Sequence, residues 1–211
     1  EIRNPLASMS GSIQVLRQDL PLNAEQAQLM DIVLRESDRL NRTIRSFLAY
    51  ARPQRFEVTR LDLRGAVNDS VLLLRHGNDT LPTHRIEASL PDTPVWCEAD
   101  EGQIKQIVWN LATNGLRAMP EGGCLRLSVS QSDDDRAMLV VEDEGIGIPA
   151  GDVDRLFQPF HGTFERGSGL GLAIVHRLVA DYQGEIQVVS EPGHGTSVTI
   201  SLPARAATHH E

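Results

Sequence analysis

Two glycine-rich segments in the second half of the chain contain residues that could bind a ligand. The first, Asp143-Glu144-Gly145-Ile146-Gly147, follows the apolar run Leu139-Val140-Val141. A carboxylate at the end of a buried strand can accept a hydrogen bond, and glycines let the backbone approach a ligand closely. The same pattern occurs where a strand simply leaves a sheet through a turn. The residues alone leave both interpretations open.

A rival reading of the first segment is a dinucleotide site. The run from Gly145 to Ala150 matches the G-x-G-x-x-A pattern of dinucleotide-binding folds. That mechanism needs a helix that opens at the third small residue, and then a second parallel strand that ends in an acid. The sequence that follows, Arg155-Leu156-Phe157-Gln158-Pro159-Phe160, has neither feature. We therefore disfavour this reading.

The second glycine segment is Gly167-Ser168-Gly169-Leu170-Gly171, which runs directly into an apolar stretch with helical spacing. Free N–H groups at the positive end of a helix dipole suit a phosphate, although ordinary capping glycines have the same appearance. Between the two segments, residues His161 to Arg166 are polar and short of apolar anchors. This stretch is typical of a mobile lid over a ligand, or of a plain surface loop.

Two asparagines, Asn110 and Asn114, lie one turn apart on a predicted helix, among residues expected to pack in a core. Buried amides need partners, so one interpretation is a hydrogen-bonded pair. The alternative is a carboxamide oxygen offered to a hard cation such as Mg²⁺, with Arg117 reaching a phosphate.

The elements that must position these residues fall into two parts. Residues 1–52 have apolar positions at helical spacing, which predicts a helix over Glu1–Asp19, a turn at Leu20–Asn23 with Asn23 as a cap, and a helix over Ala24–Ala51. Two helices alone cannot bury the seven-residue repeat of the second one. Either the hairpin packs on the rest of the chain, or two chains form a four-helix bundle, and we favour the homodimer.

Residues 57–203 alternate strand and helix patterns, which predicts an α+β fold with helices on one face of a sheet. Predicted strands are Glu57–Leu63, Arg85–Leu90, Val95–Glu98, Cys124–Gln131, Ala137–Glu142, Glu185–Ser190 and Thr196–Leu202. Predicted helices are Arg64–His76, Asp100–Met119 and Gly169–Tyr182. Residues 204–211 are expected to be a frayed tail.

The composition and charge of the chain argue against several classes of function. Twenty basic against twenty-nine acidic side chains give a net charge of −9, which is the wrong sign for binding nucleic acid. Two cysteines without C-x-x-C spacing indicate neither a disulfide scaffold nor a zinc site. No apolar run is long enough to span a bilayer, so we expect a soluble, cytoplasmic protein or the cytoplasmic part of a membrane-anchored sensor.

Taken together and in order, six segments resemble the boxes of the two-component sensor histidine kinases. They are Glu1-Ile2-Arg3-Asn4-Pro5-Leu6, Asn110-Leu111-Ala112-Thr113-Asn114, Asp143-x-Gly145-x-Gly147, Phe157-x-Pro159-Phe160, Gly167-x-Gly169-x-Gly171 and Gly193-His194-Gly195-Thr196. The first resembles the phosphoacceptor box, and its Arg-Asn-Pro-Leu form resembles kinases paired with nitrogen- or pilus-type transcriptional activators. The resemblance covers nearly the whole chain.

The resemblance implies a dimerisation and histidine-phosphotransfer hairpin over residues 1–52, followed by an α/β sandwich that binds ATP, of the type shared with gyrase and heat-shock chaperones. In this reading Asp143 accepts from the adenine amino group, supported by Thr196. Asn114 holds Mg²⁺, with Asn110 beside it and Arg117 on the phosphates. The cofactor-binding set is completed by the lid glycines and their neighbours, with the two phenylalanines at the lid root: Gly145, Gly147, Phe157, Phe160, Arg166, Gly167, Gly169, Leu170 and Gly171.

The resemblance also implies a phosphoryl acceptor, a base and a partner. In the family the phosphorylated histidine immediately precedes the glutamate of the first box, which is Glu1 here. Glu1 would act as the base, and Asn4 would place water to dephosphorylate a response regulator receiver domain. Without that histidine, residues 1–211 are expected to bind ATP but not to label themselves. A non-catalytic, dimeric ATP-binding scaffold is the alternative function.

Overall fold

The structure, a computed structural model, describes residues 11–17, 19, 21–51, 57–77, 80–160 and 169–204. Its parts form two compact units, a helical one and an α+β one that begins with the first strand. Within the described residues, no helix is long and apolar enough to cross a membrane.

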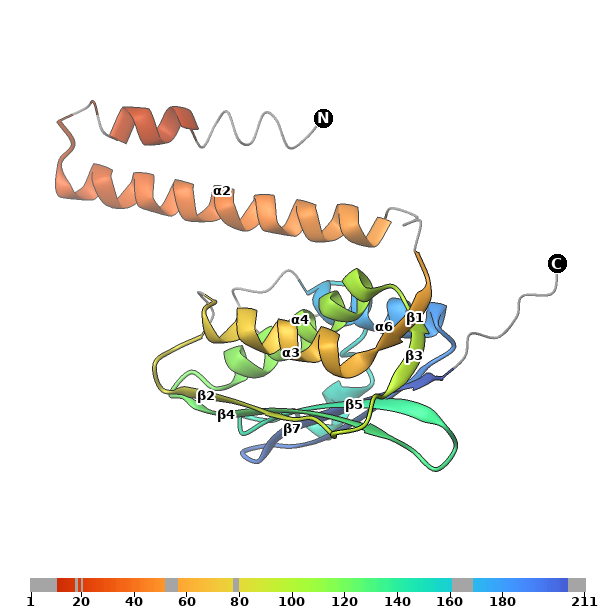
Figure 1. The fold of residues 1–211 in the computed structure, drawn as a ribbon. Helices are drawn as coiled ribbons and strands as arrows, with labels where there is room; N and C mark the ends of the chain where they lie inside the picture. Colours follow the sequence, from red (N-terminus) through yellow and green to blue (C-terminus); the bar gives the residue numbers. More distant parts are fainter. Residues whose placement is uncertain are drawn as a thin grey trace. The chain divides into compact units, whose positions relative to one another are not determined.

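The helical unit is a hairpin of residues 11–17, which are helical, and helix α2 (Ala24–Ala51) (Figure 1). Asn23 begins α2 with a reciprocal cap. The Gln26 amide donates to Asn23 Oδ1 at 2.8 Å, and the Asn23 amide donates to Gln26 Oε1 at 3.1 Å. An ion pair of 2.8 Å between Arg17 and Asp31 joins the two helices. The capping role predicted for Asn23 is confirmed.

The apolar seam of α2 is open to solvent in a single chain. Val33 and Leu40, which belong to the predicted seven-residue repeat together with Ile44 and Phe47, are about half exposed, at 48% and 47%. Ile44 is partly buried, and the side chain of Phe47 lies outside the described residues. An apolar stripe of this size on a helix is usually buried against another surface. The predicted dimer interface is therefore available in this unit.

The α+β unit is built on a five-stranded sheet with the order β2-β4-β5-β7-β6 and on a two-stranded ribbon of β1 and β3. Figure 1 shows the three longer helices of this unit on one face of the sheet. The strands are β1 (Thr59–Asp62), β2 (His84–Ser89), β3 (Trp96–Ala99), β4 (Gly123–Gln131), β5 (Arg136–Asp143), β6 (Glu185–Glu191) and β7 (Gly195–Pro203), and the helices are α3 (Leu63–Arg75), α4 (Glu101–Ala118), α5 (Ala150–Val153) and α6 (Gly171–Asp181). The predicted α+β class, with helices on one face, is confirmed.

Alternation along the central strands creates the face that the helices cover. In β5, Ala137, Leu139 and Val141 are buried, and their β7 partners are Leu202, Ile200 and Val198. Successive strand residues point to opposite faces, so the same parity that buries these side chains also turns Asp143 toward the helices. The carboxylate at the strand end is thus on the core side of the sheet.

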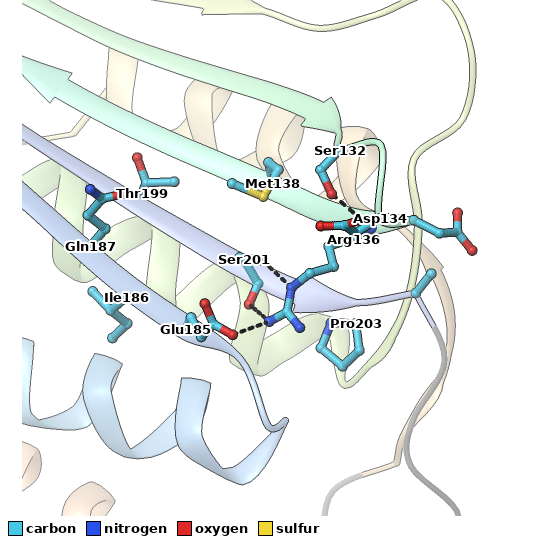
Figure 2. A pocket seen from close by; sticks show the side chains of 12 residues that line it. Ser132, Asp134, Arg136, Met138, Glu185, Ile186, Gln187, Thr199, Ser201 and Pro203 are labelled. Atoms are coloured by element: carbon cyan, nitrogen blue, oxygen red, sulfur yellow. Dashed lines mark hydrogen bonds and ion pairs between the residues drawn. The ribbon is translucent and has the colours of Figure 1, made fainter.

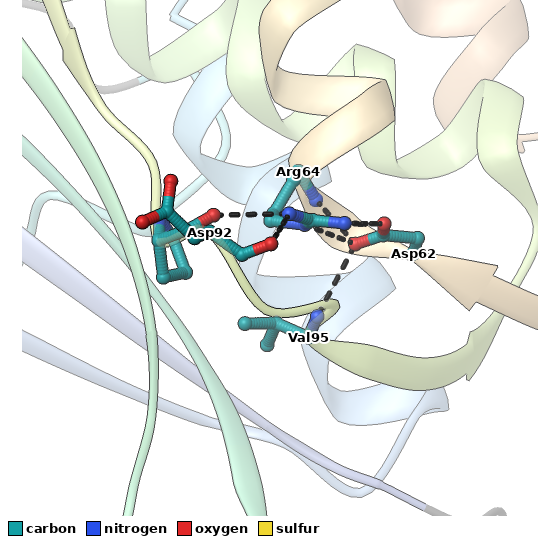
Figure 3. Close-up of polar contacts among 5 residues, drawn as sticks. Asp62, Arg64, Asp92 and Val95 are labelled. Atoms are coloured by element: carbon teal, nitrogen blue, oxygen red, sulfur yellow. Dashed lines mark hydrogen bonds and ion pairs between the residues drawn. The ribbon is translucent and has the colours of Figure 1, made fainter.

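Asp62 links the ribbon to the start of α3 (Figure 3). Its carboxylate caps α3 by accepting from the Arg64 amide at 3.2 Å, and it accepts from the Val95 amide at 3.2 Å. The Arg64 guanidinium binds the same carboxylate at 2.8 Å and donates to the Asp92 carbonyl at 2.7 Å. The hydrogen bond from Arg64 holds the pKa of Asp62 below its ordinary value.

Most element types were predicted, with boundary shifts of a few residues. The single turn of α5, which follows Pro149, was not predicted, because four residues carry no helical periodicity. The sheet is also mixed, since β2 pairs parallel to β4 while the other neighbours pair antiparallel.

Candidate nucleotide site

Asp143 lies at the last position of β5, opposite Thr196 of β7. Its Oδ1 accepts a hydrogen bond of 2.9 Å from the Gly145 amide. Burial raises the pKa of this carboxyl above its ordinary value, and backbone hydrogen bonds from Gly145 and Thr196 oppose the shift. The carboxylate is held in place by the backbone, and it retains acceptor capacity for a ligand.

Glycines allow the backbone to crowd around Asp143. A Cβ on Gly195 would lie 1.9 Å from the Asp143 carbonyl oxygen, and Gly195 has a φ of +89°. On the other side, a Cβ on Gly115 of α4 would lie 3.1 Å from the Asp143 Cβ. Side chains at either position would push against the strand end that carries the carboxylate.

The loop after β5 is fastened on two sides. The Ile146 amide donates to the Ala118 carbonyl at the end of α4 at 3.0 Å, and the Gly193 amide donates to the Ile146 carbonyl at 2.8 Å. Gly147 has a φ of +67°, and a Cβ there would lie 2.0 Å from the Glu191 carbonyl oxygen. The first glycine segment is therefore packed between α4 and the β6–β7 turn.

The Nδ2 atom of the Asn110 side chain is buried and has no hydrogen-bond partner among the described residues. The Asn110 side chain lies beside Gly171, the first residue of α6, since a Cβ there would be 3.6 Å from Asn110 Oδ1. A buried amide without a partner is costly, which makes this atom a candidate ligand contact. Asn114 and Arg117 follow on the same helix and are half-buried.

The two phenylalanines differ in their surroundings. The Phe157 ring packs against His176 of α6, with ring centroids 5.3 Å apart. Phe160 is 64% exposed and has a φ of +65°. Phe157 thus contacts α6 and Phe160 is exposed, while the role at the lid root that the resemblance implies for both stays a prediction.

Of the remaining predicted site residues, the structure describes Gly169 and Leu170. Gly169 has a φ of +65°, and Leu170 is fully buried. Glu1, Asn4, Arg166 and Gly167 lie outside the described residues. Their predicted roles stay predictions.

Ser190 lies in line with two predicted site residues, a position that the sequence analysis did not predict. It is the cross-strand partner of Thr196, which is in turn the partner of Asp143, so the three residues form one row across β6, β7 and β5. A serine at a strand end carries no motif. The signal was only the pairing register, which short-range patterns do not contain.

A hollow of about 820 Å³ lies elsewhere, on the sheet face without helices. It is lined by Arg136, Glu185 and Ser201 among others, and Figure 2 shows the Arg136 guanidinium between the last two. Arg136 Nε lies 2.5 Å from Ser201 Oγ. None of the predicted site residues lines this hollow. The predicted site residues that the structure describes therefore lie outside this hollow.

The residues around Asp143 and Asn110 suit a bound nucleotide. The Asp143 end offers a half-buried acceptor for an amino group, and Asn110 Nδ2 has no hydrogen-bond partner among the described residues. Both are on the helix side of the unit, connected by α4.

Comparison with known proteins identifies the family of this unit. Residues 99–206 match the family described as "Histidine kinase-, DNA gyrase B-, and HSP90-like ATPase". The chain belongs to this family. Residues 1–55 match a second description, "His Kinase A (phospho-acceptor) domain". The two in this order constitute the core of a sensor histidine kinase, which disfavours the non-catalytic scaffold.

Relatives are similar over nearly the whole of this chain. Sporulation kinase E of Bacillus subtilis is 33% identical over 207 residues, which are 97% of this chain and 27% of the relative. Sensor histidine kinase ZraS of Escherichia coli is 32% identical over 203 residues, which are 96% of this chain and 43% of the relative. The chain thus spans less than half of either relative.

Solved structures agree on the fold. Full-length ShkA in complex with AMPPNP has a TM-score of 0.73 and 28% identity, over 98% of this chain and 44% of that one. The mycobacterial sensor histidine kinase MprB has a TM-score of 0.61 and 29% identity, over 71% of this chain and 99% of that one.

Proposed function

We propose that the chain binds Mg²⁺ and ATP at the Asp143 site and serves in transfer of the γ-phosphoryl group to a histidine, and from there to an aspartate of a response regulator. The half-buried Asp143 carboxylate, fixed by backbone N–H groups beside Thr196, carries the proposal. Membership of the ATPase family and the AMPPNP complex of ShkA support it.

Nucleotide binding is assigned residue by residue. Asp143 accepts from the exocyclic amine of adenine, because a partly desolvated carboxylate disfavours a base edge that presents only an acceptor. Asn114 supplies a carboxamide oxygen to Mg²⁺, Asn110 lies beside it, and Arg117 reaches the phosphates. Bound Mg²⁺ would supply charge compensation at the transferring phosphoryl group.

The glycines of the second segment, Gly167, Gly169 and Gly171, are assigned to the phosphates. Gly171 begins α6, an 11-residue helix, so free backbone N–H groups occur at this point of the chain. Arg166 is proposed as a further phosphate contact.

The helical unit is proposed to supply the acceptor and the dimer. The phosphorylated histidine would precede Glu1, which would act as its base, and Asn4 would position water for receiver dephosphorylation. The exposed seam of Val33 and Leu40 supports association of two chains into a four-helix bundle. The Arg3-Asn4-Pro5-Leu6 form favours a nitrogen- or pilus-type activator as the regulator.

The test is incorporation of acid-labile phosphate from γ-labelled ATP. A polypeptide restricted to residues 1–211 does not include the proposed histidine, so it should bind ATP without labelling. A chain extended by a helical segment ending in histidine should label, because the imidazole must be held near the γ-phosphate and an error of about 1 Å costs roughly 10²-fold.

Two outcomes would contradict separate parts of the proposal. Equal labelling of the chain with and without the added histidine would refute the acceptor assignment. Normal receiver dephosphorylation by the Asn4→Ala variant would remove the phosphatase role and leave the kinase role intact.

A further inference from the structure

Glu144 follows Asp143 directly and bonds to the neighbouring strand through its side chain. β5 pairs with β4 up to Asp143, which lies opposite Leu125. One residue further on, Glu144 Oε2 accepts a hydrogen bond of 3.0 Å from the Cys124 amide of β4. The side chain of Glu144 therefore continues the contact with β4 at the point where the ladder between the two strands ends.

The second carboxylate oxygen of Glu144 also has a donor. Its Oε1 accepts from the Arg126 guanidinium at 2.6 Å, and Arg126 Nε lies 3.7 Å from a carboxylate oxygen of Glu87 on β2. The hydrogen bond from Arg126, together with the one from the Cys124 amide, holds the pKa of Glu144 below its ordinary value, so the side chain is ionised at neutral pH. These two bonds fix a side chain that is 43% exposed.

The peptide unit after Glu144 connects this side chain to the candidate site. The amide that donates to Asp143 Oδ1 at 2.9 Å is that of Gly145, so it lies in the peptide unit that joins Glu144 to Gly145. A peptide unit is planar, and the backbone dihedrals of the two residues that it joins set its orientation. The direction of the Gly145 N–H therefore depends on how firmly Glu144 is held.

Gly145 cannot supply this restraint itself. A Cβ at this position would lie 2.7 Å from Asp143 Oδ1 and 2.6 Å from the Ala118 Cβ, so the site requires glycine. Glycine restricts its own backbone dihedrals less than any other residue. The Ile146 amide holds the far side of the loop, and the side chain of Glu144 holds the near side.

We propose that Glu144 is a positioning residue for nucleotide binding: bound to β4, it fixes the peptide unit whose N–H orients the Asp143 carboxylate. This inference rests on the proposed function, since it concerns the carboxylate that accepts from adenine. The Glu144 carboxylate is itself taken up by Cys124 and Arg126, so Glu144 acts through Asp143 and makes no contact with the nucleotide.

The experiment measures the dissociation constant of a non-hydrolysable ATP analogue, with Mg²⁺, by calorimetry. Glu144→Ala should bind the analogue about three- to tenfold more weakly than the parent, the effect of losing one hydrogen bond. Glu144→Gln keeps an acceptor for the Cys124 amide at the same length and should bind within about twofold of the parent, because the exposed ion pair that it loses contributes little. Glu144→Asp keeps the charge but is one methylene shorter, so it should bind as weakly as Glu144→Ala.

A double-mutant cycle with Asp143 separates positioning from a general loss of stability. In the Asp143→Ala background, Glu144→Ala should weaken binding by less than about twofold, because no carboxylate is left to orient. Glu142→Ala is the matched control, since Glu142 is an exposed acid two residues earlier in the chain, on β5, and this variant should bind like the parent. Should Glu144→Ala fail to fold, the comparison of Glu144→Asp with Glu144→Gln still tests the reach of the side chain.

The outcomes separate the inference from the proposed function. Parent affinity in Glu144→Ala or Glu144→Asp refutes the role of Glu144 alone, as does a Glu144→Gln variant that binds as weakly as Glu144→Ala. An equal loss from Glu144→Ala with and without the Asp143 carboxylate also refutes it, because the effect then does not pass through that carboxylate. A parent chain that does not bind the analogue refutes the proposed function itself.

Discussion

Replacement of Gly195 by alanine should destabilise the α+β unit far more than the same change two residues earlier. Both Gly193 and Gly195 have a left-handed φ, +81° and +89°. A Cβ on Gly193 would meet nothing within 4 Å, whereas one on Gly195 would lie 1.9 Å from the Asp143 carbonyl oxygen. Comparing the two variants therefore separates the free-energy cost of the left-handed backbone conformation from the cost of steric overlap.

The magnitudes follow from these two terms. A non-glycine residue in the left-handed region costs about 1–2 kcal/mol, which is the full effect expected for Gly193→Ala. Overpacking adds about 1–3 kcal/mol at Gly195, so Gly195→Ala should lower the free energy of unfolding by about 2–5 kcal/mol. Relief of the overlap must move the end of β5, so this variant should also lose ATP affinity.

Urea unfolding, monitored by tryptophan fluorescence, measures the free energy of unfolding of the α+β unit. The chain has two tryptophans, Trp96 and Trp109, and both lie in the α+β unit. Equal unfolding free energies for Gly193→Ala and Gly195→Ala would refute the reasoning, because the backbone around Asp143 would then have room that the structure does not give it.

Four further predictions concern other parts of the chain. Burial raises the pKa of Asp143, so its ionised form lowers stability above that pKa; Asp143→Asn should unfold at higher urea than the parent at neutral pH, and the difference should shrink as the pH falls. Asp62 has a lowered pKa, so its contribution is present at neutral pH and lost as the pH falls through that value; Asp62→Ala should cost about 0.5–2 kcal/mol at pH 7 and much less in acid. Gly65→Ala should raise the free energy of unfolding by about 0.5–1 kcal/mol, since a Cβ on this helical residue meets nothing within 4 Å, and a lower urea midpoint would contradict this. Leu40→Arg combined with Phe47→Arg should sediment as a monomer where the parent is a dimer, and a variant that remains dimeric would move the interface elsewhere.

Local patterns predicted most of the elements. Alternation indicated the strands, and helical spacing of apolar residues indicated α4, whose Gly115 lies against Asp143. These features depend on neighbours along the chain, which the sequence displays directly.

Features that depend on strand pairing could not be predicted from local sequence patterns. The row of Ser190, Thr196 and Asp143 exists only because β6, β7 and β5 pair in one register. For the same reason, local patterns do not show that Gly147 packs against the Glu191 carbonyl at the end of β6.

The most direct test of the central claim is calorimetric titration of a non-hydrolysable ATP analogue, with Mg²⁺, into the parent chain, Asp143→Ala and Glu142→Ala. Glu142 is the neighbouring exposed acid on β5 and serves as the control. The parent and Glu142→Ala should bind alike, and Asp143→Ala should bind about 5- to 150-fold more weakly, equivalent to about 1–3 kcal/mol for a buried donor left unpaired. Equal affinity of Asp143→Ala and the parent would contradict the assignment of Asp143 as the residue that reads the base.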